Sequence, residues 1–279
     1  MNWLYYLLEA NLYLILFYTF YRVFLQQETF YNANRYYLLL SSLLAFLLPI
    51  LQLGMLKPSQ MVEQFTAATV IEESEMLAIV PTVATELETD FHFVDYLYPL
   101  YLGISLLFTL KLALDIAKIV NLWLKAKKNR KDGIIYVTLR ENAAFSFFNW
   151  LFIHPHLAEK STVINHEMVH IKQKHSYDIL LFELLQIVSW SNPVSYLIKK
   201  DIKLIHEYIA DELSTGSNVQ KHEYAMFLIE HSFGVMPTAL TNQIFNQSIL
   251  KRRINMLNKK RTAGWHLLLI LFFRGQIHC

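Results

Sequence analysis

The 279-residue chain contains few charged residues and only one cysteine. Charged residues make up 17% of the sequence and hydrophobic residues 54%, whereas ordinary soluble domains carry about a quarter charged residues. This composition argues against a wholly soluble protein and favours a membrane protein. The single cysteine, Cys279, excludes an internal disulfide framework and is consistent with folding in a reducing compartment. The net charge of +2 indicates no particular class of partner.

Three long stretches are apolar enough to cross a membrane: residues 3–25, 36–53 and 94–117. Each has about the length that a helix needs to span a hydrocarbon core of about 30 Å. Tyrosines near the start of the third stretch are typical of an interfacial aromatic belt. The first stretch lacks a basic amino-terminal region and a small-residue cleavage site, so we interpret it as a membrane helix and not as a removable signal peptide.

The charges around these stretches separate by sign. Residues 54–93 carry seven carboxylates against one basic residue, Lys57, whereas the third stretch runs into a cluster of lysines and arginines. Arg22 and Arg35 bracket the short first loop. Because basic flanks stay in the cytoplasm, the amino terminus and the acidic loop are expected outside, and everything from about residue 120 onward inside. The sequence therefore predicts a multi-pass protein of the cell membrane.

The hydrophobicity pattern divides the chain into three parts. We expect a membrane domain over residues 1–120, a cytoplasmic domain over 121–262, and the beginning of a fourth transmembrane segment over 263–279, which is too short for an ordinary span. Within the cytoplasmic part, the extended runs Ile134–Arg140 and Phe145–Ile153 predict a small β-hairpin. The expected fold is a mainly α membrane protein with three transmembrane helices, a partial fourth, and a cytoplasmic α+β zincin-like domain.

Helical patterns fill the rest of the cytoplasmic part. Asn192-Pro193 is a helix start signal, with asparagine as the cap and proline in the first turn. The apolar periodicity and the capping residues predict helices over Ser161–His175, Tyr177–Trp190, Pro193–Leu213, Val219–Phe233 and Phe245–Lys259.

The segment His166-Glu167-Met168-Val169-His170 has the spacing of a zinc-binding motif. Two histidines four residues apart lie on one face of a helix, so both imidazoles can reach one metal ion. The glutamate between them can hold a water molecule and act as the catalytic base. The alternative is that these are packing or surface histidines on an amphipathic helix.

A catalytic zinc ion normally takes three protein ligands, so a third is needed. Glu207 and Asp211 lie four residues apart on a predicted helix, where Glu207 can bind the metal and Asp211 can accept the free ring N–H of a histidine ligand. A solvated helix face is the alternative for this pair, and His206 and Glu183 remain alternative ligands. A metzincin-like site is disfavoured because Gln173 replaces the glycine that this class requires.

The extended run before the motif is a candidate substrate-binding strand, with Phe145, Ser146, Phe147 and Phe148 as its candidate residues. An extended peptide could pair with the edge of this strand and present one peptide bond to the metal. The aromatic side chains can equally belong to the core. A donor for the oxyanion is also needed, and the candidates for it are His175, His206 and Tyr208.

Several segments together resemble the BlaR/MecR-type antirepressor membrane metallopeptidases. They are the three apolar stretches, the basic flank, Ser146-Phe147-Phe148, the histidine motif, Trp190-Ser191-Asn192-Pro193, Glu207 to Asp211, and Leu250-Lys251-Arg252-Arg253-Ile254. The resemblance covers nearly the whole chain. It implies a cytoplasmic gluzincin-like domain between the third and fourth spans, with zinc ligands His166, His170 and Glu207 and with Glu167 as the catalytic residue.

The same resemblance implies a regulatory zinc endopeptidase that cleaves a cytoplasmic protein, such as a transcriptional repressor, or itself. The expected partners are a peptide or protein substrate, the lipid bilayer and a second copy of the chain in a homodimer, without direct nucleic-acid binding. Family members that sense β-lactams continue into an extracellular penicillin-binding domain, whereas this chain stops at Cys279. The alternatives are a non-catalytic signalling scaffold with a structural metal and a housekeeping membrane zinc peptidase. Glu167 favours an enzyme, because a structural zinc site does not require it.

Overall fold

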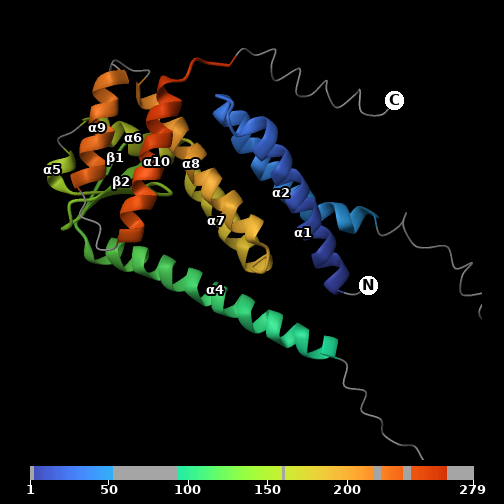
Figure 1. The fold of residues 1–279 in the computed structure, drawn as a ribbon. Helices are drawn as coiled ribbons and strands as arrows, with labels where there is room; N and C mark the ends of the chain where they lie inside the picture. The colour runs from blue at the N-terminus through green and yellow to red at the C-terminus, as the bar shows by residue number, and fades with distance from the viewer. Residues whose placement is uncertain (1–2, 53–92, 159–160, 216–220, 235–239, 263–279) are drawn as a thin grey trace, which may run out of the picture.

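The computed structural model describes residues 3–52, 93–158, 161–215, 221–234 and 240–262. Most of the acidic loop predicted at 54–93, and the partial fourth span predicted at 263–279, lie outside these residues. The described part is mostly helical and contains one small sheet (Figure 1).

Three of the described helices are long and apolar enough to cross a membrane. Helix α1 (Trp3–Phe20) continues into a short π-helical segment, η1 (Tyr21–Leu25), and packs against α2 (Tyr31–Gln52). Helix α4 (Phe93–Lys125) extends beyond the end predicted at residue 117. At about 1.5 Å per residue it is about 50 Å long, so it reaches well beyond a hydrocarbon core of about 30 Å.

The sheet has the strand order β1-β2-β4-β3. Its strands are β1 (Lys128–Lys131), β2 (Ile134–Thr138), β3 (Ala144–Phe147) and β4 (Trp150–Ile153). The hairpin predicted between the two extended runs is wrong, because β2 pairs with β4 in parallel. The second run contains its own tight turn, in which Phe148 takes a left-handed φ of 50°, so β3 and β4 pair with each other.

In the part of the chain that the structure describes, six helices follow the sheet: α5 (Pro155–Ala158), α6 (Ser161–Lys172), α7 (His175–Val188), α8 (Pro193–Thr215), α9 (Lys221–Gly234) and α10 (Leu240–Asn258). Most lie close to the predicted ranges. Helix α6 ends earlier than expected, because Lys174 takes a left-handed φ of 57° and His175 starts the next helix. Asn192 caps α8 as predicted, since its side-chain oxygen accepts the backbone N–H of Val194 at 2.9 Å.

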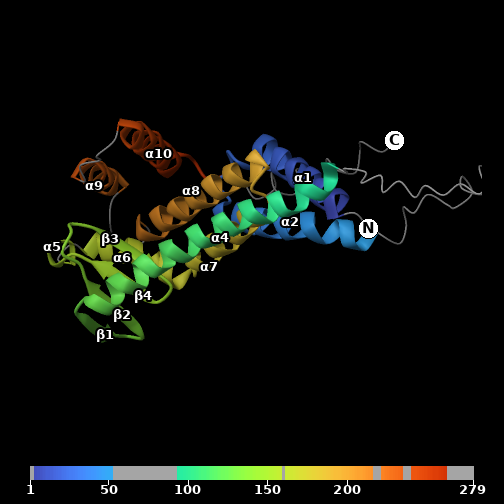
Figure 2. The same cartoon turned by 90° about the horizontal axis from the view of Figure 1, so that it is seen from below.

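Helix α8 lies at the centre of the molecule and contacts α1, α2, α6, α7 and α10 (Figure 2). One hydrophobic cluster includes Leu14 of α1, Leu38 of α2, Phe182 of α7, and Ile202 and Ile209 of α8. The apolar amino-terminal helices and the helices around the histidine motif therefore share a core, which positions α8 against both.

Candidate metal centre

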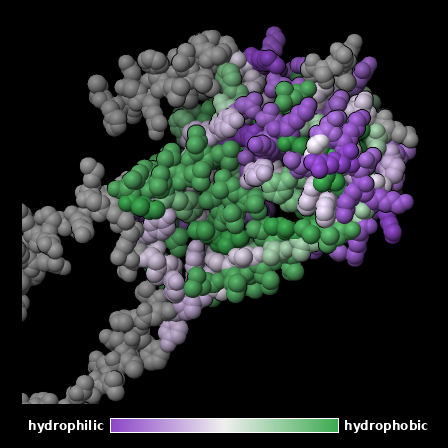
Figure 3. Space-filling model, turned by 180° about the vertical axis from the view of Figure 1, so that it is seen from behind, coloured by the Kyte–Doolittle hydropathy of each residue, from purple (hydrophilic) through white to green (hydrophobic). Residues whose placement is uncertain are grey.

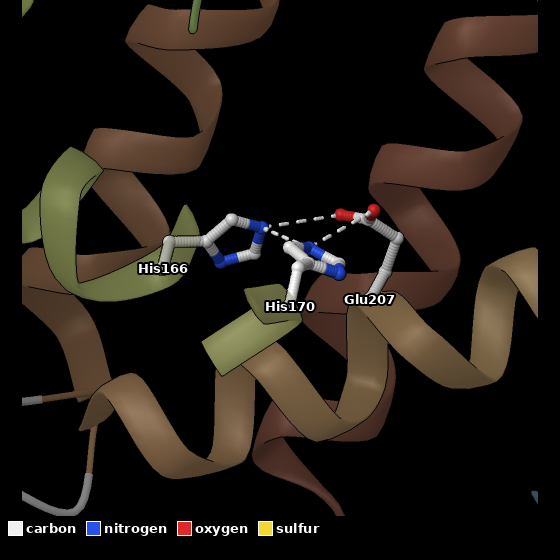
Figure 4. A group of neighbouring side chains, drawn as sticks. All are labelled: His166, His170 and Glu207. Carbon is white, nitrogen blue, oxygen red and sulfur yellow. Dashed lines mark hydrogen bonds and ion pairs between the residues drawn. The ribbon is translucent and has the colours of Figure 1, made fainter. Parts of the chain in front are cut away.

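Three side chains converge between α6 and α8 (Figure 4). His166 and His170 lie one turn apart on α6, and their Nε2 atoms are 3.3 Å apart. Glu207 comes from α8. Its Oε2 lies 3.5 Å from the His166 Nε2, and its Oε1 lies 3.7 Å from the His170 Nε2. One ligand atom from each of the three residues lies within 4.8 Å of the others.

These distances fit a bound divalent metal ion. Tetrahedral ligands at about 2.0–2.1 Å from a metal lie about 3.3–3.5 Å from one another. The Nδ1 atom of each histidine is engaged by another side chain, which leaves the Nε2 lone pairs directed at the shared position. Two histidines and one glutamate are also a ligand set that catalytic metal sites use. The chain thus offers three ligands in suitable geometry.

His166 is supported from the side of α9 and α10. Its Nδ1 lies 2.9 Å from the Tyr224 hydroxyl, which donates to Asp211 Oδ1 at 2.9 Å. Arg253 donates to both oxygens of Asp211, at 2.8 and 2.6 Å, and lies 2.8 Å from Glu207. Asp211 was expected to accept the histidine ring N–H itself. Its oxygen is 3.6 Å from the His166 Nδ1, and the hydroxyl of Tyr224 joins the two.

His170 is supported by a different group of side chains. Its Nδ1 lies 2.8 Å from the Nδ1 of His175, and the His175 ring stacks on His206 with a centroid distance of 3.9 Å. The Nε2 of His206 lies 2.8 Å from Asp178. Arg35, on α2, donates to the same carboxylate oxygen at 2.6 Å. A continuous series of contacts therefore joins His170 to an apolar amino-terminal helix.

The electrostatic environment favours the metal-binding forms of two of the three candidate ligands, His170 and Glu207. Burial opposes the charged form of His166, but the hydrogen bond and charge of Glu207 outweigh burial and raise the pKa of His166. Burial lowers the pKa of His170 to about 4. Burial would raise the pKa of Glu207, but the Arg253 guanidinium and the two histidines hold it well below its usual value. At neutral pH, His170 is therefore neutral and Glu207 ionised, which are the forms that bind metals.

A pocket of about 500 Å³ opens beside the three ligands. Its wall includes His170, Glu207, Glu167, residues of β3 and residues of α4. Burial raises the pKa of Glu167, against the opposing effects of His166 and of a hydrogen bond from Ser146. A carboxyl group with a raised pKa beside a metal position is suited to proton transfer.

The candidate substrate residues divide between this pocket and the β3–β4 turn. Phe145, Ser146 and Phe147 line the pocket. Phe145 also stacks on the buried Phe152 at 4.6 Å, so its ring serves the core as well. Phe148 lies in the turn, where it packs edge-on against Tyr177 at 4.8 Å.

The alternative ligands take other partners. His206 pairs with Asp178, and Glu183 lies 2.7 Å from Lys199. Within the described residues, neither belongs to the group that could hold a metal. Of the candidate oxyanion donors, His175 supports His170, and Tyr208 packs against Tyr31 at 5.3 Å.

Sequence reasoning missed several supporting residues. Tyr224 and Asp178 show no motif, and Arg253 was noted only within the segment that carries the family resemblance. Arg35 was interpreted only as a marker of the cytoplasmic side. A charged side chain that is 5% exposed, as Arg35 is, must have a partner, but no sequence signal identified Asp178 as that partner.

Residues 154–257 match a family model described as BlaR1 peptidase M56. The matched segment contains the histidine motif, Glu207, and the residues that support His166. Arg35 and the apolar amino-terminal helices lie outside it. No match to a curated protein was found.

Proposed function

Because the match confirms the resemblance to BlaR/MecR-type peptidases over residues 154–257, we propose that this chain is a regulatory zinc metalloendopeptidase of the membrane. Its substrate is a cytoplasmic protein, such as a repressor, or the chain itself. The observation that carries the proposal is the convergence of His166, His170 and Glu207 beside Glu167. A zinc ion held by these ligands would polarise the scissile carbonyl and lower the pKa of water to about 7.

Glu167 is the proposed general base. It accepts a proton from a water molecule in the pocket and then returns this proton to the leaving amine. Burial raises its pKa toward the working pH, which makes the return step easier. Ser146 and Glu167 both line the pocket, and the interaction with Ser146 partly opposes the rise in the pKa of Glu167.

Strand β3 is the proposed substrate platform. It is the last strand in the order β1-β2-β4-β3, so one of its edges has no neighbouring strand among the described residues. The pocket lies along Ala144–Phe147, which make up this strand. A peptide paired with that edge would run past Glu167 and the metal ligands in an extended conformation.

The proposed topology has the amino terminus outside and the peptidase segment in the cytoplasm. The apolar helices α1, α2 and α4 would cross the bilayer. Arg22 and Arg35 would lie on the cytoplasmic side, together with the lysines and arginine of β1.

The test of this function is Glu167→Gln. Removing the base should lower peptide cleavage by about 10²- to 10⁴-fold, while zinc content stays at the wild-type value because Glu167 is not a ligand. The matched control is Glu183→Gln, which changes another carboxyl group on the pocket wall and should keep most of the activity. Full cleavage by Glu167→Gln would refute the mechanism, and a wild-type protein that binds zinc without cleaving any peptide would favour a scaffold role.

A further inference from the structure

The hairpin formed by α7 and α8 has an uncharged tip. Residues 184–198 contain no aspartate, glutamate, lysine or arginine. The first charged residues on either side are Glu183 and Lys199, and these two form an ion pair at 2.7 Å. An ion pair thus closes the base of the tip, and beyond it the hairpin contains only apolar and neutral polar side chains.

The tip buries four polar residues and exposes large apolar ones, although Ser191 at the turn is also exposed. Gln186, Ser189, Asn192 and Ser195 are each 6% exposed or less. The large side chains on its surface are apolar, namely Leu184 at 50%, Val188 at 39%, Tyr196 at 40% and Leu197 at 46% exposed. In water the opposite arrangement is usual, because exposed apolar surface is unfavourable there. In a bilayer, polar groups face the protein interior.

Four backbone carbonyls at the tip accept hydrogen bonds from side-chain hydroxyls. The hydroxyls of Ser105 and Tyr101, on α4, donate to the carbonyls of Ile187 and Val188 at 3.3 and 2.5 Å. Within the hairpin, Ser195 donates to the carbonyl of Ser189 at 3.1 Å, and Tyr196 to that of Trp190 at 3.0 Å. Carbonyls at the end of a helix can bond to water in a soluble protein, but in hydrocarbon they need protein donors.

Contacts with α1 fix how deep the tip lies. Asn192 donates to Asn11, in the middle of α1, at 2.9 Å. Asp201 lies 3.6 Å from Arg22, in the η1 segment that continues α1. At about 1.5 Å per residue, Asn11 is about 16 Å from Arg22 along the axis. Half of a hydrocarbon core is about 15 Å thick. With Arg22 at the interface, the tip reaches about the middle of the bilayer.

Contacts with α4 also place the tip away from the charged residues that follow Tyr101 on that helix. The carbonyl of Val188 is bound by Tyr101, and the first charged residue after Tyr101 on α4 is Lys111. These two positions are about 15 Å apart along the helix. Figure 2 shows α7 and α8 lying alongside α1, α2 and α4, and Figure 3 shows a broad hydrophobic surface over this half of the molecule, opposite the hydrophilic end.

We infer that the α7–α8 hairpin is a re-entrant element, which enters the bilayer from the side of Arg22 and returns without crossing it. Lipid acyl chains cover Leu184, Val188, Tyr196 and Leu197. The inference rests on α1, α2 and α4 crossing the membrane and does not depend on catalysis. It also places Glu207, about 22 Å along α8 from Asn192, just beyond the hydrocarbon core.

The test uses single nitroxide labels in the full chain reconstituted into liposomes. Cys279→Ser removes the only cysteine, and one cysteine is then introduced by Leu197→Cys or by Leu213→Cys. Both leucines lie on α8 and are exposed to nearly the same extent, 46% and 47%. A third variant, Leu106→Cys, reports on α4, where the leucine is 68% exposed.

Oxygen concentrates in hydrocarbon, whereas a neutral nickel chelate stays in water. The label at 197 should collide severalfold more with oxygen and severalfold less with the chelate than the label at 213, and should resemble the label at 106. Equal chelate access at 197 and 213, with 106 shielded, would overturn the re-entrant hairpin alone. Chelate access at 106 as well would overturn the membrane spans on which it rests. Shielding of 197 from both reagents, with spin–spin broadening, would show that a second copy covers the face and would also overturn lipid contact.

Discussion

The two histidines of the candidate metal centre lie one turn apart on one helix, but they are held by networks of different origin. His166 is joined through Tyr224 to Asp211 and Arg253, all within the segment that matches the peptidase family. His170 is joined through His175, His206 and Asp178 to Arg35, which lies on α2, outside that segment.

His166 is thus supported by nearby residues of the matched segment, whereas the support of His170 extends to a distant helix. The network of His166 is closed, because Arg253 also contacts Glu207, the third candidate ligand. The network of His170 ends on a helix that is apolar enough to cross a membrane, so a shift of α2 would act on Asp178 first and then on the stacked histidine rings. Changes to each network should therefore have distinguishable effects.

The largest effect is expected for Asp211→Asn. The substitution removes the charge that Arg253 binds and weakens the hold on the Tyr224 hydroxyl, so zinc affinity should fall by about 10- to 100-fold. Competition with a chromophoric chelator measures this affinity. The control is Glu212→Gln, whose partner Arg261 is 84% exposed in its side chain, so its loss should change little. Equal losses in the two variants would contradict the role of Asp211.

A smaller fall in zinc affinity, of about tenfold, is expected for Arg35→Met, because among the described residues Asp178 then keeps His206 alone as a partner. The control, Arg22→Met, removes a half-exposed arginine from a looser ion pair and should leave zinc affinity unchanged. Arg35→Met should also lower the thermal midpoint, since it leaves a buried carboxylate without its cation. Adding Asp178→Asn should restore part of that stability, and additive losses in the double variant would show that the pair is not coupled.

Tyr224→Phe should have a milder effect than either change. The ring is fully buried and is kept, while the hydroxyl between His166 and Asp211 is lost. One hydrogen bond corresponds to about 1 kcal/mol, or about fivefold in zinc affinity. A loss as large as that of Asp211→Asn would show that Asp211 acts only through this hydroxyl.

The smallest expected effect is a difference between His166 and His170 in a pH titration of the metal-free protein. The pKa of His166 is raised by Glu207, and that of His170 is lowered by burial to about 4, so acid should protonate His166 first. Ring-labelled histidine in NMR resolves the two steps. Glu207→Gln should lower the pKa of His166, because the charge that stabilises its imidazolium is removed. If His170 became protonated at a higher pH than His166, the expected order of the two pKa values would be wrong.

The candidate ligands, which the structure brings together, could be recognised from sequence because their spacing is local. His166 and His170 share one helical face, and Glu207 and Asp211 share another, so helical periodicity alone aligns each pair. Tyr224 and Arg253 reach Asp211 only because α9 and α10 pack beside α8, and this packing leaves no local pattern.

The sheet was predicted less well for a related physical reason. Aromatic residues favour strands, and the pattern could not show that the run Phe145–Ile153 turns back at Phe148, a residue type that rarely takes positive φ. Parallel pairing of β2 and β4 joins residues that are separated by β3, so no adjacent turn signal reveals it.

The left-handed backbone at Lys174 has a consequence for the metal centre. On an uninterrupted helix, side chains five residues apart point about 140° away from each other, so His175 could not meet His170. The break turns α7 back toward α6 and brings their ring nitrogens within 2.8 Å. The angle between α6 and α7 therefore sets the distance between the imidazoles of His170 and His175. A tilt of α7 would shift His175 against His170 without any change within α6.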